Sequence, residues 1–129
     1  MPKVTQLTIA AENKPGTLAR ICSVLAKEGV NIQAGLAPEV RGKGRVRLLV
    51  DDRDKAKAAL KAAKIRFAEE EAIALTLDNK PGALAEITEK LAKSKINIKY
   101  AYATTFEGAE RATVVLAVPN IEKALAALG

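Results

Sequence analysis

The stretch Glu12-Asn-Lys-Pro-Gly-Thr-Leu-Ala19 returns 66 residues later as Asp78-Asn-Lys-Pro-Gly-Ala-Leu-Ala85. More than half of the positions in residues 12–32 are identical in residues 78–98, and the alignment needs no gap. A period of this size is typical of one structural unit that the chain uses twice. Each copy of this unit therefore carries one Asn-Lys-Pro-Gly motif.

Hydrophobic periodicity gives the same order of elements in both copies. Alternation predicts a strand before each motif, and apolar residues at i, i+3, i+4 and i+7 predict a helix after it. Gly29 is expected to end the first helix. The pattern predicts first strands at 4–11 and around 73–75, second strands at 30–34 and 96–102, third strands at 45–50 and 111–118, and last helices at 54–63 and 120–128. In this alignment Arg45 and Arg111 keep the offset of 66.

Lys64–Phe67 supplies a fourth strand in the first copy, which gives the βαββαβ pattern of ferredoxin-like folds. The second copy ends at Gly129, before a fourth strand. We therefore predict an α+β protein with two ferredoxin-like repeats, 1–68 and 69–129, packed side by side, the second lacking its last strand. The edge beside that repeat's first strand is expected to be uncovered and to serve as an assembly site. Where Ile65–Phe67 pairs stays open at this point.

The motif has a chemistry of its own at a strand-to-helix junction. Proline suits the first turn of a helix, and the preceding asparagine can accept hydrogen bonds from first-turn amides. Glycine lets another group approach the backbone. The amides that follow, at Thr17 and Leu18 or at Ala83 and Leu84, favour an anion such as a carboxylate. Since asparagine also carries a donor and an acceptor, each loop resembles a small receptor for a zwitterion. The alternative is that each motif is only a capped helix start.

Both motifs, each followed by (Val/Ile)-Asn-Ile at 30–32 and 96–98, resemble the tandem ACT-domain family, and the resemblance covers nearly the whole chain. It implies paired βαββαβ domains that bind amino acids at interfaces between domains. Most well-known members are fused to a catalytic domain, and none is recognisable in these residues. The ligand contacts that the resemblance implies are Asn13, Pro15, Gly16, Thr17 and Leu18 in the first copy, and Asn79, Pro81, Gly82, Ala83 and Leu84 in the second.

Asn31 and Asn97 are second-tier ligand candidates, with an ordinary exposed polar residue as the alternative. Their strand face is expected to point away from the helices. In the second copy the small residues Ala101, Ala103 and Thr105 share that face, which suits packing of another element. Tyr100 and Tyr102 are expected to lie on the opposite face, in the core. Cys22 fits the apolar face of the first helix and is interpreted as structural.

Composition excludes several classes of function. The chain has no histidine and one cysteine, so the commonest general base, the commonest metal ligand and a Cys-x-x-Cys site are missing. We expect no catalytic residues, no metal and no cofactor. The net charge of +6 permits nucleic-acid contact. The third strands, however, lack the aromatic residues of an RNA-recognition motif. No apolar stretch resembles a signal peptide or a membrane span, and the lone cysteine suits a reducing cytoplasm.

These observations predict a non-catalytic regulatory module that binds a free amino acid, or a close analogue, at inter-domain interfaces formed by the two loops. The expected partners are the amino acid, further copies in a homodimer or larger homo-oligomer, and a separate regulated enzyme. Neither a membrane nor a nucleic acid is expected as a partner. The alternative is a basic ferredoxin-like module that docks a protein or a nucleic acid and has no small-molecule ligand.

Overall fold

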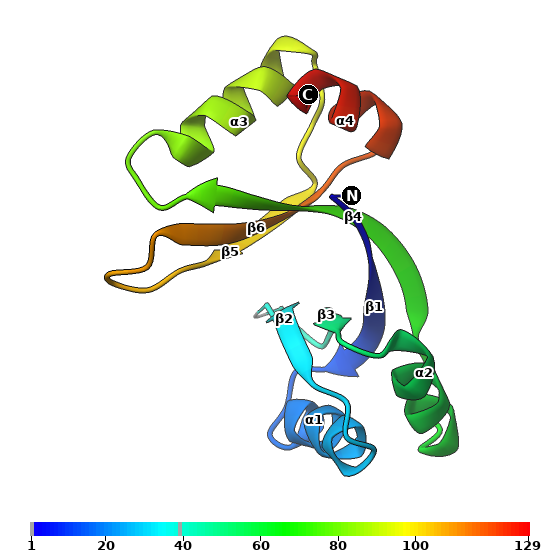
Figure 1. Ribbon diagram of the computed structural model, residues 1–129. Helices are drawn as coiled ribbons and strands as arrows, with labels where there is room; N and C mark the ends of the chain where they lie inside the picture. The colour runs from blue at the N-terminus through cyan, green and yellow to red at the C-terminus, as the bar shows by residue number, and fades with distance from the viewer. Residues whose placement is uncertain (1, 39) are drawn as a thin grey trace. The chain divides into compact units, whose positions relative to one another are not determined.

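The computed structural model describes residues 2–38 and 40–129. Within them the helices and strands alternate in the predicted order, twice over (Figure 1). The elements are β1 (Lys3–Glu12), α1 (Thr17–Lys27), β2 (Ile32–Leu36), β3 (Lys43–Val50), α2 (Arg53–Ala62), β4 (Ala68–Asp78), α3 (Ala83–Lys93), β5 (Tyr100–Thr104), β6 (Arg111–Ala117) and α4 (Ile121–Leu128). The α+β class is confirmed.

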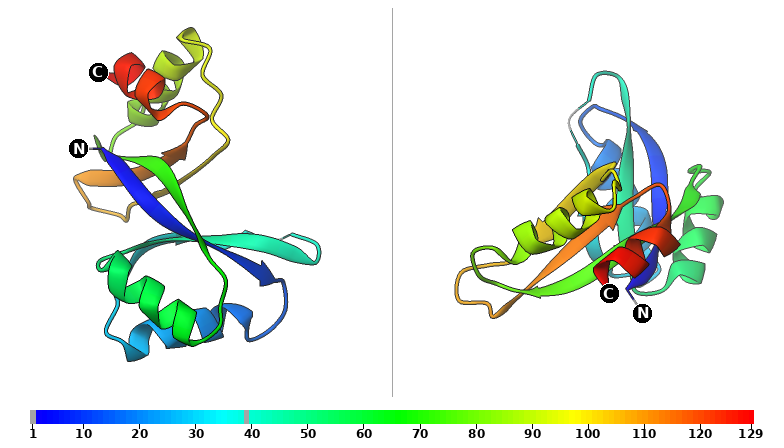
Figure 2. Two further views of the ribbon diagram at one scale, coloured as in Figure 1. Left: turned by 90° about the vertical axis from the view of Figure 1, so that its right-hand side faces the viewer. Right: turned by 90° about the horizontal axis from the view of Figure 1, so that it is seen from above.

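Contacts divide the chain into two compact units. The first unit is Thr5–Glu70, and the second unit combines Glu71–Gly129 with the N-terminal residues as far as Val4. In the first unit β3 pairs antiparallel with both β1 and β2, and α1 and α2 lie together on one face of these strands (Figure 2). Alternation along β1 directs Leu7 and Ile9 toward this face, where they are buried with Leu25 of α1 and Leu60 of α2.

The second unit repeats this layout. β6 pairs antiparallel with both β4 and β5, and α3 and α4 form the helical layer (Figure 2). Ile73 of β4, Leu91 of α3, Leu116 of β6 and Ala124 of α4 are fully buried together. Each unit therefore builds its own aliphatic core from the apolar positions that set the sequence pattern.

The helix ends after α1 and α3 show how closely the copies agree. Gly29 has a φ of 73° and follows α1, as the sequence predicted. Val30 N–H donates to Leu25 O and Gly29 N–H to Ala26 O, the paired bonds of a Schellman motif. Lys95 takes the same left-handed conformation after α3, with a φ of 56°. A lysine thus occupies a position that suits glycine.

Two expectations about the fourth strand are wrong. Ile65–Phe67 lies outside any strand, because the chain turns at Lys64 and β4 begins only at Ala68. The edge beside the second repeat's first strand is also not open, since Ala74 N–H donates to Pro2 O at 2.7 Å. The start of β1 therefore extends the second unit, and Ala68–Glu70 at the start of β4 belongs to the first.

The acidic run Glu69-Glu70-Glu71 lies inside β4. Each carboxylate has a cation nearby: Lys57 at 2.7 Å from Glu69, Arg47 at 3.5 Å from Glu70 and Lys3 at 3.4 Å from Glu71. Because these pairs offset the repulsion between like charges, the strand continues through the acidic run.

The strand register corrects the equivalence of Arg45 and Arg111. Lys43 of β3 stands opposite Glu12, whereas Arg111 of β6 stands opposite Asp78, the counterpart of Glu12. Arg111 therefore corresponds to Lys43, at an offset of 68 residues instead of 66. The matching register pairs are Leu36 with Arg47 and Tyr102 with Val115, and the second pair encloses two more residues (103–114) than the first (37–46). An ungapped alignment misses this insertion.

The faces predicted for β5 are also reversed. Tyr102 stands opposite Val115, and Ala101 stands opposite Leu116, which belongs to the core under the helices. The tyrosines therefore lie on the side away from α3 and α4, and the alanines on the side toward them. The cause is that residues 96–99 are not in a strand, so the alternation does not carry through from Ile98 to Tyr100.

Candidate ligand-binding loops

A left-handed glycine begins the helix in each Asn-Lys-Pro-Gly loop. Gly16 and Gly82 both have a φ of 90°, and both are the N-cap residues of their helices. No side chain caps either helix by a hydrogen bond. The expectations that asparagine caps the helix and that proline lies in its first turn are therefore wrong, since Pro15 and Pro81 precede the N-cap.

Asparagine instead ties the loop to a neighbouring hairpin. Asn13 Nδ2 donates to Val40 O at 2.8 Å, and Asn79 Nδ2 donates to Ala109 O at the same distance. The backbone N–H of each asparagine donates as well, Asn13 to Gly42 O at 2.7 Å and Asn79 to Glu110 O at 2.9 Å. The alternative that each motif is only a capped helix start relied on asparagine as the cap. The asparagine side chain instead forms a hydrogen bond to the hairpin in both copies.

The first-turn amides stay available in both copies. Arg20 N–H is bonded to Gly16 O, whereas Thr17 N–H is 3.4 Å from Lys14 O, a long hydrogen bond. The amides of Leu18 and Ala19 have no intrahelical partner at this position of a helix. The second copy repeats the arrangement, with Ala83 N at 3.3 Å from Lys80 O. Such amides carry the partial positive charge of a helix start and favour an anion.

An exposed leucine stands beside these amides in each unit. Leu18 and Leu84 are each 45% exposed, whereas Leu25 of α1 and Leu91 of α3 are fully buried. Their exposure is equal although the two loops have different neighbours. Both leucine side chains are therefore accessible to solvent beside the loop.

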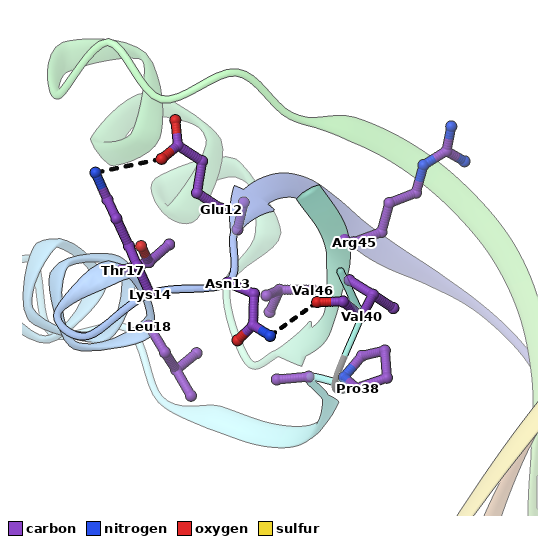
Figure 3. Close-up of a pocket in the computed structure, with 12 residues that line it drawn as sticks. Glu12, Asn13, Lys14, Thr17, Leu18, Pro38, Val40, Arg45 and Val46 are labelled. Atoms are coloured by element: carbon purple, nitrogen blue, oxygen red, sulfur yellow. Dashed lines mark hydrogen bonds and ion pairs between the residues drawn. The ribbon is translucent and has the colours of Figure 1, made fainter. Parts of the chain in front are cut away.

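Two pockets adjoin the first loop. One, of about 150 Å³, lies between the start of α1 and the β2–β3 hairpin, and is lined by Asn13, Lys14, Thr17, Leu18, Pro38 and Val40 among others (Figure 3). The other, of about 530 Å³, includes Pro15, Gly16, Thr17 and Arg20. All five residues expected to contact the ligand in the first copy thus line a pocket. Lys14, which lines both, forms an ion pair with Glu12 at 3.3 Å.

The sequence prediction missed several residues that line these pockets, among them Val40, Arg45, Lys43 and Ile65. Pairing of Glu12 with Lys43 places the hairpin beside the loop. The motif itself does not reveal that pairing. The available signal was the side-chain amide of Asn13, whose donors need acceptors and find one at Val40 O in the hairpin.

Position 20 distinguishes the two loops. Arg20 Nη2 donates to Ala63 O at 2.8 Å, which links α1 to the end of α2. The matching residue in the second copy is Glu86, which stands 3.7 Å from Lys90 on the same helix. The first loop therefore has a cation at its rim where the second has an anion.

Asn31 and Asn97 lie apart from the loops. Both are exposed and come after the C-terminal ends of α1 and α3, while the loops precede the N-terminal ends. Asn31 N–H donates to Asp51 Oδ1 at 2.9 Å. A helix of 11 residues spans about 16 Å, so these asparagines do not gather with the loop residues of their own units.

Cys22 is half-buried on α1 and forms no disulfide. Among residues 2–38 and 40–129, no cluster of three His, Cys, Asp or Glu side chains could hold a metal ion. In the same part of the chain no helix is long and apolar enough to cross a membrane.

Comparison with known proteins identifies the family. The sequence profile of the ACT domain pair matches residues 2–128, and the chain belongs to this family. The crystal structure of protein BT0572 from Bacteroides thetaiotaomicron is similar, with 33% identity and a TM-score of 0.90 over 98% of this chain and 87% of that one. No match is found among curated protein sequences.

Regulatory subunits of aspartate kinase share the fold. The one from Thermus thermophilus, in its ligand-free form, has 22% identity and a TM-score of 0.66 over 96% of this chain and 87% of that one. The one from Thermus flavus has 18% identity and a TM-score of 0.61 over 99% and 95%. The chain thus shares its fold with these two proteins over nearly its whole length.

Proposed function

We propose that this chain is a non-catalytic regulatory module that binds a free amino acid, or a close analogue, at its Asn-Lys-Pro-Gly loops. The observation that carries the proposal is the repetition of one geometry in both units. The glycine at φ 90°, the asparagine bonded to the hairpin and the leucine at 45% exposure recur together. A structural helix start does not need these three features in combination, since many other sequences cap a helix.

The loop offers complementary groups for a zwitterion. The ligand's carboxylate would take the first-turn amides around Thr17 and Leu18, where the helix start favours negative charge. Because Asn13 donates through Nδ2 to Val40 O, its Oδ1 is the atom left to accept a bond from the ammonium. Leu18 would cover the ligand's apolar part. Asn79, Ala83 and Leu84 supply the same groups in the second unit.

Ligand binding would be read out through assembly. A second copy of the chain, or a separate enzyme, would complete the interface over the exposed leucines, and the ligand would stabilise the assembled state. A ligand at a hundredfold excess over its dissociation constant adds about 2.7 kcal/mol to the state that binds it. The fold shared with aspartate kinase regulatory subunits supports a regulatory role of this kind. Residues 1–68 and 69–129 would act as the two ligand-binding repeats, in the cytoplasm.

Isothermal titration calorimetry against the twenty amino acids, pooled and then singly, tests the proposal. One amino acid should bind, and Leu18→Gln together with Leu84→Gln should weaken it by about tenfold, the equivalent of ~1.4 kcal/mol. These leucines are exposed, so the fold should tolerate the changes. Phe106→Gln is the matched control, because Phe106 is 75% exposed and lies outside both loops.

The single variants show which repeat binds the amino acid. Loss of heat in Leu18→Gln alone would assign binding to the first unit, and loss in Leu84→Gln alone would assign it to the second. The proposal fails if no amino acid binds. It also fails if the two substitutions in one chain leave the affinity unchanged.

A further inference from the structure

A third pocket lies in the first unit, outside the ligand-binding loops. It has a volume of about 260 Å³ and is lined by Thr8, Ala10, Arg45, Arg66, Phe67 and residues 68–70. The register pairs Thr8 with Arg47 and Ala10 with Arg45, so these four side chains share the sheet face opposite Leu7 and Ile9. Figure 3 shows the Arg45 guanidinium directed away from Asn13 and Val40, and thus away from the loop pocket.

One buried polar atom in this pocket lacks a partner. Thr8 is 7% exposed, and its Oγ1 is buried without a hydrogen bond to any described residue. Burial of a hydroxyl without a partner costs free energy, so native proteins seldom leave one. A ligand atom that accepts a hydrogen bond would satisfy Oγ1.

The charges around the pocket are not balanced. Glu69 is paired with Lys57 at 2.7 Å, and Glu70 with Arg47 at 3.5 Å. Arg45 and Arg66 have no carboxylate within ion-pair distance among residues 2–38 and 40–129. The two carboxylates in the lining are thus paired with other cations, and the guanidinium groups of Arg45 and Arg66 have no ion-pair partner among the described residues. Arginine presents planar pairs of donors that match carboxylate and phosphate oxygens.

The second unit shows that the fold does not require these residues. By the offsets of 66 and 68, Thr8 corresponds to Ala74, Ala10 to Thr76 and Arg45 to Thr113. The same sheet face there has no guanidinium group at these positions and still forms the same strand pairs. The arginine and the buried hydroxyl are additions that only the first unit carries.

We propose that this pocket is a second binding site, specific for the carboxylate or phosphate group of a small anionic molecule. Thr8 Oγ1 donates to the anion, and the guanidinium groups of Arg45 and Arg66 neutralise it. The half-buried ring of Phe67 bounds the non-polar part of the ligand. The site shares only Arg45 with the smaller loop pocket and only Ala10 with the larger one, and its other lining residues lie outside the proposed amino-acid site, so that ligand at one can be measured without ligand at the other.

Amide NMR spectra of the ¹⁵N-labelled full chain, titrated with inorganic phosphate and separately with succinate at constant ionic strength, test this site. We expect saturable shifts at the amides of Thr8, Ala10 and Arg66. The probe that saturates at lower concentration shows whether the group bound is a phosphate or a carboxylate. Leu18→Gln should leave both curves unchanged, which separates this site from the loops.

Substitutions then separate recognition from general charge. Thr8→Val keeps the shape of the side chain and removes the donor, and Arg66→Gln removes one charge; each should weaken binding about tenfold, or ~1.4 kcal/mol. Thr8→Ser, which keeps the hydroxyl, should retain affinity. Lys27→Gln removes the same charge from an exposed site on α1 and should change nothing. The proposal is overturned if neither probe gives saturable shifts at these residues, or if Lys27→Gln weakens binding as much as Arg66→Gln.

Discussion

The two Asn-Lys-Pro-Gly loops have the same backbone and different surroundings. Gly16 and Gly82 share a φ of 90°, and both asparagines donate to a hairpin carbonyl at 2.8 Å. At the matching position of the following helix, however, Arg20 donates to Ala63 O in the first unit, whereas Glu86 pairs with Lys90 in the second. The motif thus determines the loop conformation, while the charges available to a ligand depend on the strands and helices around it.

The largest expected effect tests whether the two cores are equivalent. Leu25 and Leu91 hold matching places in α1 and α3, and neither is exposed. Truncation of either to alanine should lower the free energy of unfolding by about 2–5 kcal/mol, because it removes buried methyl groups and leaves a cavity. Urea denaturation followed by circular dichroism measures the change. Leu18→Ala, at an exposed site, should cost much less; a large cost at only one of the buried sites would show that the cores differ.

A smaller effect is expected at the two glycines. Gly16→Val and Gly82→Val should each lower the free energy of unfolding by about 1–3 kcal/mol, because a β-branched residue is strained at positive φ. No atom stands within 4 Å of an added Cβ at either site, so the cost is conformational in both. The two values should therefore agree in urea titrations. Gly16→Asn is the matched control, because asparagine tolerates a positive φ better than valine. If Gly16→Asn lowered the free energy of unfolding as much as Gly16→Val, the conformational explanation would be contradicted.

The helix ends allow a substitution in the stabilising direction. Lys95 holds the left-handed position at which the first unit has Gly29. Lys95→Gly should raise the free energy of unfolding by about 0.5–1 kcal/mol. This is the strain that glycine relieves at a positive φ, reduced by the greater conformational entropy that glycine gives the unfolded chain. Thermal unfolding reads the change. The reciprocal Gly29→Lys should lower stability by a similar amount, and a neutral result for both would mean that the left-handed lysine is not strained.

The smallest effect concerns the ion pair between Lys57 of α2 and Glu69 of β4. The hydrogen bond from Lys57 lowers the pKa of Glu69 below its ordinary 4.5, and the charges of Lys57 and Arg53 add to this while desolvation opposes it. A lowered folded pKa contributes stability above the unfolded value, and that stability is lost as the pH falls through the folded value. Lys57→Gln should move the Glu69 midpoint upward in a carboxyl NMR titration. Lys55→Gln on the same helix should leave the Glu69 midpoint unchanged. If neither substitution moved the midpoint, the pairing of Lys57 with Glu69 would be contradicted.

Local patterns in the sequence predicted what local physics controls. The alternation of Leu7 with Ile9, the helical spacing after each motif and the stop at Gly29 are all confirmed. The role of Asn13 was missed because the sequence does not distinguish a helix cap from a hydrogen bond to a distant hairpin. Either one satisfies the hydrogen-bonding groups of the side chain. Only the partner, 27 residues away at Val40, decides between them.

The other errors come from long-range pairing. The closing contact of Pro2 with Ala74 joins residues that no local pattern relates. The two-residue insertion in the second hairpin shifts Arg111 into the place of Lys43, although an ungapped alignment matches two arginines. The donor set of Thr8, Arg45 and Arg66 is likewise invisible in the sequence, because it gathers residues from three separate segments.

The central claim is that an amino acid binds at the Asn-Lys-Pro-Gly loops. An amide NMR titration of the ¹⁵N-labelled chain with the twenty amino acids, pooled and then singly, tests it residue by residue. For one amino acid we expect saturable shifts at the amides of Thr17 and Leu18, of Ala83 and Leu84, or of both pairs. Spectra that stay unchanged with every amino acid, or shifts that avoid both loops, would contradict it.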